Sequence, residues 1–109
     1  MRGELNQTVA SSITISTNLG PVEIDALRHG ALACHQGVGP YKSRWVVTHI
    51  PTGFAMSSKG TFGNEKAAVA AMEEIAGKGD WTDMSSPNRR KLGKMVAAVF
   101  AKHGAETEA

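Results

Sequence analysis

The sequence lacks the residues from which disulfides and many metal sites are built, since it contains one cysteine, Cys34, among 109 residues. A single cysteine excludes an internal disulfide and any zinc site made from paired cysteines. No apolar run approaches the roughly 20 residues that a membrane-spanning helix needs, and residues 1–12 are polar without a hydrophobic export region. We therefore expect a cytoplasmic protein with no membrane partner.

The sequence also lacks a recognisable catalytic constellation. Cys34 and His35 are adjacent, and neighbours on a strand point to opposite faces, so they do not form a nucleophile and base directly. His49 on another strand is a more remote base, and a buried, inert thiol is the favoured alternative. The histidines share no metal-ligand spacing and are expected at the surface or at a sheet edge: His29, His35, His49 and His103. We expect no enzymatic activity, no metal and no cofactor.

The composition is that of one folded domain. Hydrophobic residues make up 41% of the chain and charged residues 20%, which is too apolar and too weakly charged for general disorder. A length of 109 residues is that of a single domain. We expect this domain to cover residues 12–104, with flexible segments at 1–11 and 105–109.

The first half of the chain has the alternating pattern of strands. In residues 12–16 the β-branched Ile13 and Ile15 fall on one face, and residues 18–21 supply turn chemistry for a hairpin. Residues 37–43 contain two glycines and a proline and predict a loop. The predicted strands are Ser12–Ser16, a segment around Val22 and Ile24, a short segment around Leu32 and Cys34, Trp45–Ile50, and Phe54–Ser57.

The second half changes to a helical period. Asn64 and Gly77 stand where a helix over 65–76 needs its cap and its stop. A second helix is predicted from Ser86 as cap, with Pro87 in its first turn, to near Gly104. Its apolar stripe is Leu92, Met95, Val96, Val99, Phe100 and His103. The predicted fold class is α+β: a small antiparallel sheet of about four or five strands followed by two C-terminal helices packed on one face.

The net charge of +2 conceals blocks of opposite sign. Residues 26–64 carry four cations and no acid, residues 65–83 have a net charge of −3, and residues 84–103 carry five cations and no acid. Such segregation predicts surfaces of opposite potential.

Two cationic clusters are candidates for recognition. The first cluster lies where the chain enters the strand Trp45–Ile50, and it interleaves aromatic with basic residues. Aromatic rings can stack on bases while cations neutralise phosphates. Its members are Tyr41, Lys42, Arg44 and Trp45, with Lys59 in the same acid-free stretch. The alternative is a core Trp45 with solvated flanks. The second begins the last helix, where cations oppose the helix dipole, so helix stability does not explain them: Arg89, Arg90, Lys91 and Lys94. The alternative is an ordinary solvated basic face.

Residues 44–76 resemble the AP2-type DNA-binding domain of plant transcription factors and some mobile-element integrases and nucleases. The match rests on Gly60-Thr61-Phe62 before an alanine-rich helix, on Trp45–Ile50 as a central strand, and on Ala68, Ala71, Met72 and Ala76 at the family's helix positions. The resemblance implies a three-stranded sheet packed on one helix and a DNA-binding role. The family reads DNA with Arg and Trp on its last strand, where this chain has Met56 and Ser58.

The sequence therefore predicts a small nucleic-acid-binding module that uses its basic, aromatic-containing sheet region. The alternative is a protein-binding inhibitor or adaptor of the kind encoded by phages and mobile elements. It would set the basic last helix against an acidic partner surface, and the modest net charge of +2 suits this alternative.

Overall fold

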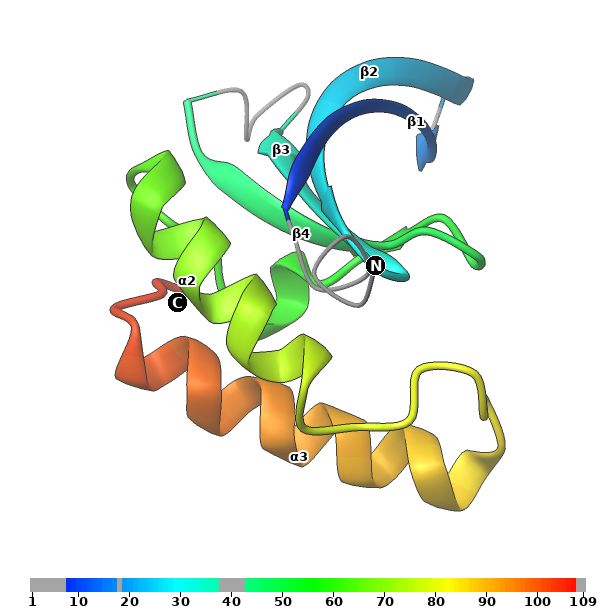
Figure 1. Ribbon diagram of the computed structural model, residues 1–109, viewed down its shortest axis with the longest axis vertical. Coiled ribbons are helices and arrows are strands. Elements are labelled where there is room, and N and C mark those ends of the chain that lie inside the picture. The colour runs from blue at the N-terminus through cyan, green and yellow to red at the C-terminus, as the bar shows by residue number, and fades with distance from the viewer. Residues whose placement is uncertain (1–7, 18, 38–42, 108–109) are drawn as a thin grey trace.

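The computed structural model describes residues 8–17, 19–37 and 43–107, which form a sheet followed by helices (Figure 1). This confirms the predicted α+β fold. The predicted loop at 37–43 lies mostly outside the described residues. In chain order the elements are β1 (Val9–Thr17), β2 (Gly20–His29), β3 (Leu32–Gln36), β4 (Trp45–His49), β5 (Phe54–Ala55), the 3-10 helix η2 (Ser57–Lys59), α2 (Glu65–Ala76) and α3 (Ser86–Lys102).

The sheet is an antiparallel meander in the order β1-β2-β3-β4-β5. The hairpin of β1 and β2 forms with Ile13 opposite Ile24, and both strands arch at the end of the molecule away from α3 (Figure 1). Strand β1 begins at Val9, paired with Arg28, so it includes three residues of the segment that we expected to be flexible. Strand β5 is shorter than predicted, because the chain turns into η2 after Met56.

The two faces of the sheet bury separate apolar clusters. On one face Leu32, Cys34 and Val47 pack with residues of both helices and with Phe62 in the main cluster. On the other face a smaller cluster collects Ile13, Ile15, Ala26 and Ala33. The alternation of strand side chains explains this division, since Ala33 stands between Leu32 and Cys34 and points the opposite way. Both helices therefore serve the same face, as predicted.

Helix α2 has the bounds predicted from its sequence. Asn64 accepts a hydrogen bond on Oδ1 from the backbone N–H of Ala67 at 2.8 Å, which satisfies one free donor of the first turn. Its buried face consists of Ala68, Ala71, Met72 and Ile75. The small alanine side chains let α2 lie close to β3 and β4.

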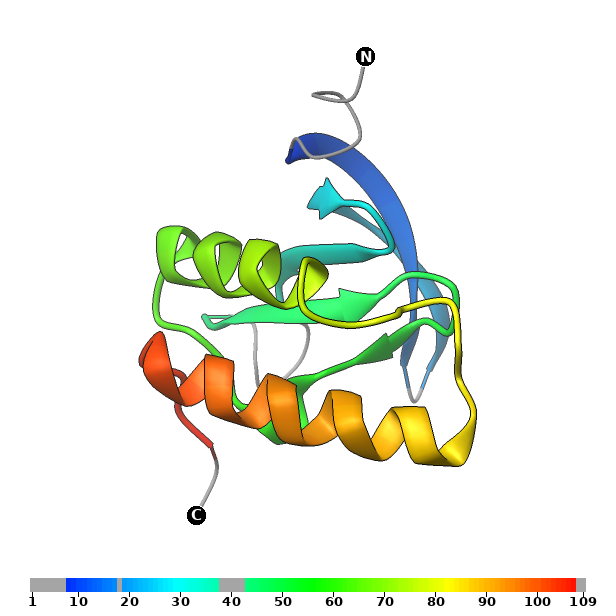
Figure 2. The same cartoon turned by 60° about the horizontal axis from the view of Figure 1, so that its bottom comes forward.

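Helix α3 runs antiparallel to α2, as the path of the connection 77–85 shows (Figure 2). The helix begins at Ser86, so Ser85 and not Ser86 is the N-cap, and the Ser85 side chain makes no capping hydrogen bond. The apolar stripe is confirmed: Leu92, Val96, Val99 and Phe100 are buried, and Met95 packs against the main cluster. The Phe100 ring meets the Phe62 ring edge-on, with centroids 5.0 Å apart.

The segment after α3 folds back onto the chain before α2. The Ala105 N–H donates to the Phe100 carbonyl at 2.9 Å, and Glu106 exchanges two backbone hydrogen bonds with Thr61 at 2.8 and 2.9 Å. Ala105 and Glu106 belong to the segment 105–109 that we expected to be flexible. The structure instead ties both residues to the folded body.

Candidate functional site

Cys34 is an inert core thiol. Its side chain is fully buried, and burial, with smaller contributions from Glu65 and Glu73, raises the pKa of Cys34 to about 12. The thiol is therefore protonated at neutral pH and is a poor nucleophile. The structure agrees with the sequence analysis in giving this cysteine a packing role.

Two histidines are buried, which corrects the expectation of surface or edge positions. His35 holds a hydrogen bond between Nε2 and Thr48 Oγ1 at 2.7 Å and another between Nδ1 and the Gln36 carbonyl at 2.9 Å. Since a carbonyl only accepts, Nδ1 carries the proton and Nε2 accepts from the hydroxyl. Burial lowers the pKa of His35, so the ring stays neutral. His49 Nε2 donates to the Trp81 carbonyl at 3.0 Å, so both imidazoles are committed to internal bonds.

The two residues of the cluster at the start of β4 that the structure describes there, Arg44 and Trp45, do not form an open cationic surface. Arg44 donates from Nε to Thr61 Oγ1 and from Nη2 to the Thr61 carbonyl, both at 3.0 Å, and pairs with Glu106 at 2.7 Å. Trp45 is half-buried and packs against the main cluster. Tyr41 and Lys42, the other predicted members, lie outside the described residues.

A surface pocket of about 590 Å³ lies between η2 and α3 and is lined mainly by cationic side chains. Its α3 residues fall at intervals of three and four, so they share one helical face. That face differs from the apolar stripe, which points to α2 and the sheet. We call this site the basic pocket; its lining residues are Lys59, Ser86, Arg89, Arg90, Gly93, Lys94 and Ala97.

Lys59 lies beside Gly93 of α3 in the basic pocket. A methyl group built on Gly93 would lie 3.6 Å from Lys59 Nζ and 3.7 Å from Lys59 Cε, which is van der Waals contact. A larger side chain would occupy the place of the Lys59 ammonium. A glycine inside a helix costs about 0.8–1.0 kcal/mol relative to alanine. Gly93 therefore leaves space for the Lys59 ammonium but lowers the stability of α3.

The cations of the basic pocket have no carboxylate partner among the residues that the structure describes. Arg89 Nη2 makes a long hydrogen bond, 3.5 Å, to Ser86 Oγ. Within the described chain, no hydrogen bond to another side chain is recorded for Lys59, Arg90 or Lys94. Lys91 is also exposed on α3 but does not line the pocket.

The two acids that precede α3 in the connection from α2 are occupied elsewhere. Asp80 accepts from the Thr82 N–H at 3.0 Å and from its hydroxyl, and these bonds lower the pKa of Asp80. Asp83 accepts from the Ser85 N–H at 2.9 Å. Neither carboxylate pairs with the arginines at the start of α3. The first turn of α3 also holds no acid of its own.

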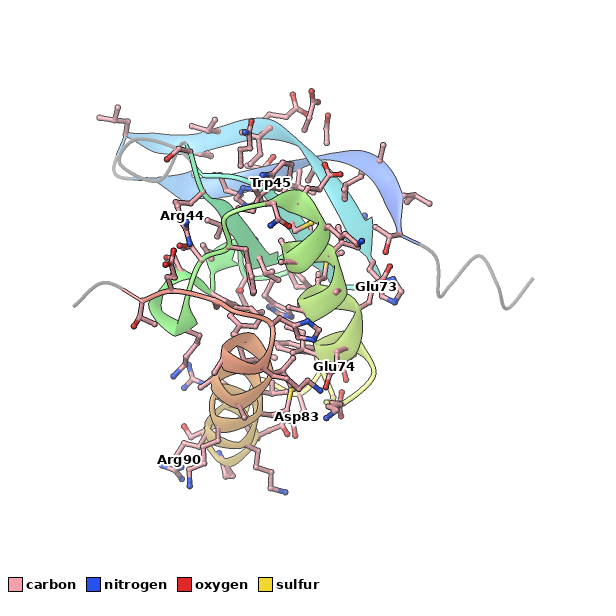
Figure 3. All side chains as sticks on the ribbon, turned by 90° about the vertical axis from the view of Figure 1, so that its left-hand side faces the viewer. Arg44, Trp45, Glu73, Glu74, Asp83 and Arg90 are labelled. Atoms are coloured by element: carbon pink, nitrogen blue, oxygen red, sulfur yellow. The ribbon has the colours of Figure 1, made fainter. Side chains whose placement is uncertain are left out.

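Three basic side chains outside the pocket share one carboxylate. Glu74 on α2 lies within 3.1 Å of Lys78, 2.5 Å of Lys102 and 2.8 Å of His103. Hydrogen bonds, first from Lys102, then from His103 and Lys78, lower the pKa of Glu74 to about 2. Figure 3 shows Glu73 and Glu74 on one side of the molecule and Arg90 projecting from α3 on the other. The predicted separation of the charge blocks is therefore incomplete, because Lys102 of the block 84–103 pairs with Glu74 of the block 65–83.

The sequence analysis grouped Lys59 with Arg44 and kept both apart from the cations of the last helix. In the structure Lys59 lines one pocket with Arg89, Arg90 and Lys94, and Arg44 does not line this pocket. The α3 part of this face was readable from its helical spacing. The role of Gly93 and the capture of Arg44 by Glu106 depend on contacts between distant segments and had no sequence signal.

Comparisons with known proteins place no further constraint on this site. No family model matches the chain, and no curated protein and no solved structure matches it. Neither helix that the structure describes is long and apolar enough to cross a bilayer. In the same described ranges, no three His, Cys, Asp or Glu side chains gather as a metal site would require.

Proposed function

We propose that the chain is a non-enzymatic nucleic-acid-binding module whose main contact is the basic pocket. The observation that carries the proposal is the convergence of four cations without a described carboxylate partner: Lys59, Arg89, Arg90 and Lys94. Like charges held together on a folded surface repel one another, and an anionic ligand removes that repulsion.

Phosphate groups suit this arrangement because their binding is driven largely by release of condensed counterions. Each cation that neutralises one phosphate releases roughly one counterion, so affinity falls steeply as salt rises. For a module with few contacts we expect dissociation constants on the order of 10⁻⁴ to 10⁻⁶ M at physiological salt. The start of α3 adds a partial positive charge from its backbone N–H groups.

A second candidate is an inhibitor or adaptor that sets the same helix against an acidic protein surface. It is favoured by the position of three of the four pocket cations on one helix face and by the net charge of only +2. In this case the cations would pair with carboxylates, and nucleic acid would bind weakly at physiological salt.

The test is a fluorescence anisotropy titration of labelled DNA and RNA, single- and double-stranded, at about 50 mM and about 200 mM salt. Lys94→Glu in the pocket is matched by Lys66→Glu on α2, which changes the charge equally outside the pocket. We expect the first substitution to weaken binding and lower the salt dependence by about one counterion, and the second to change binding little. Absence of binding by the folded wild type at the lower salt would refute the proposal.

A further inference from the structure

We infer that the ligand of the basic pocket is the sugar-phosphate backbone of a double-stranded nucleic acid, held without regard to its sequence. This inference rests on the proposed function and specifies its ligand. It follows from the cationic chemistry of the lining, from the internal contacts of the aromatic side chains that the structure describes, and from the charge density of a duplex.

The lining presents donors and almost no acceptors. Besides the four cations it contains the Ser86 hydroxyl and the small residues Gly93 and Ala97. Asn88 is the nearest amide side chain on α3, and its Nδ2 is occupied by the carbonyls of Asp80 at 2.9 Å and Asp83 at 2.6 Å. A site of this composition matches phosphate oxygens, which only accept.

Arg89 and Arg90 share the pocket with Lys59 and Lys94. Arginine reads guanine at the floor of the major groove, which is about 8.5 Å deep and admits a protruding helix or ribbon. Arg89 and Arg90 instead line a hollow in which η2 stands beside α3 and Lys59 closes against Gly93. Cationic side chains of this kind contact backbone phosphates, and such contacts position the protein without specifying sequence.

The described aromatic side chains do not offer a platform for unpaired bases. Phe62 and Phe100 are buried, and Trp45 packs against the main cluster. Trp81 donates from Nε1 to the Ile75 carbonyl at 2.9 Å and faces the His49 ring at 5.6 Å. Proteins that hold single strands rely on stacking of bases on aromatic rings, and the rings named here are engaged in contacts within the protein.

Charge density then favours the duplex. Double-stranded DNA carries one charge per about 1.7 Å of axis, against about 3.4 Å for one strand, and releases about 0.9 counterion per phosphate against about 0.7. The four cations of the basic pocket therefore predict a slope of log affinity against log salt of about −3.6 for a duplex and about −2.8 for a single strand.

The test is a competition titration with a labelled mixed-sequence DNA duplex and the full chain. The unlabelled competitors are three unrelated duplexes, single strands of equal length, and poly-L-glutamate as an acidic polypeptide. We expect the duplexes to compete equally within about twofold and the single strands at least about threefold less well. Lys59→Gln with Lys94→Gln should reduce the duplex slope by about two for every sequence, whereas Lys66→Gln should leave it unchanged.

Each other outcome overturns a defined statement. Single strands that compete as well as duplexes, or one duplex preferred more than about tenfold, overturn this inference and leave the proposed nucleic-acid function standing. Poly-L-glutamate that competes better than every nucleic acid overturns both in favour of an acidic protein surface. Failure of the labelled duplex and of labelled single strands to bind at low salt also overturns both.

Discussion

Helix α2 begins at the side-chain cap of Asn64, packs an alanine-rich face on the sheet, and carries Glu74 bonded to three cations. Helix α3 begins at Ser86 after the N-cap Ser85, whose side chain makes no capping bond. It contains Gly93 in its interior and carries cations in its first turns that have no carboxylate partner among the described residues. Each of these α3 features opposes helix stability by a few tenths to about 1 kcal/mol. The two helices share one core, so the difference lies on their exposed faces, and it is consistent with the binding role that we propose for α3.

The largest expected effect tests whether α3 is as integral to the core as α2. Phe100→Asp removes a ring packed on Phe62 and buries a carboxylate, and we expect a loss of at least about 3–5 kcal/mol. Val96→Asp should act in the same direction. Thermal melts by circular dichroism measure both. Lys94→Glu on the opposite face is the control, with a change within about 0.5 kcal/mol. Equal, small losses for all three would show that α3 is detached.

The two N-caps provide a smaller and more direct contrast. Asn64→Ala removes the bond to the Ala67 N–H and should lower stability by about 1 kcal/mol. Ser85→Ala removes no capping bond and should change stability by less than about 0.5 kcal/mol. Urea unfolding of the two variants measures the difference. A loss for Ser85→Ala as large as that for Asn64→Ala would contradict the contrast between the helices.

Gly93→Ala should make α3 more like α2. The added methyl group reaches Lys59 at an ordinary contact distance, so helix propensity dominates and we expect a gain of about 0.5–1 kcal/mol. Gly93→Leu should instead displace Lys59 and weaken anion binding. Melting temperature and anisotropy report these changes separately. Tighter anion binding by the leucine variant would refute the assignment of Lys59 to the pocket.

The smallest expected effect on stability concerns the ion pairs of Glu74 on α2, which have no counterpart among the described residues of the basic pocket. The pKa of Glu74 is lowered in the folded state to about 2 from an ordinary 4.5. The stabilisation is therefore complete above pH 4.5 and is lost as the pH falls toward 2. Because the carboxylate is solvent-accessible, screening keeps the effect small. Melting temperatures across this range should fall less in Glu74→Gln than in the wild type; parallel curves would refute the assignment.

The local sequence was sufficient to predict α2, because its N-cap, its alanine-rich face and its terminal glycine all lie within one segment. Prediction failed where the contacting residues are distant in sequence. The early start of β1 depends on pairing of Val9 with Arg28, and the burial of His49 depends on Trp81. The basic pocket likewise needs η2 to lie beside α3. The resemblance to AP2-type domains stays a prediction that no comparison tests.

The meander has a consequence for how the chain folds. Each described strand pairs with its neighbour in sequence, so loops close in short steps and their entropy cost stays low. The main cluster, however, is completed by Val96, Val99 and Phe100 of α3. Stopped-flow refolding followed by tryptophan fluorescence should therefore report α3 docking after the sheet. During synthesis, α2 can cover Leu32 and Val47 first, but the main cluster stays incomplete until residues 86–106 have left the ribosome, and aggregation threatens the chain most during that interval.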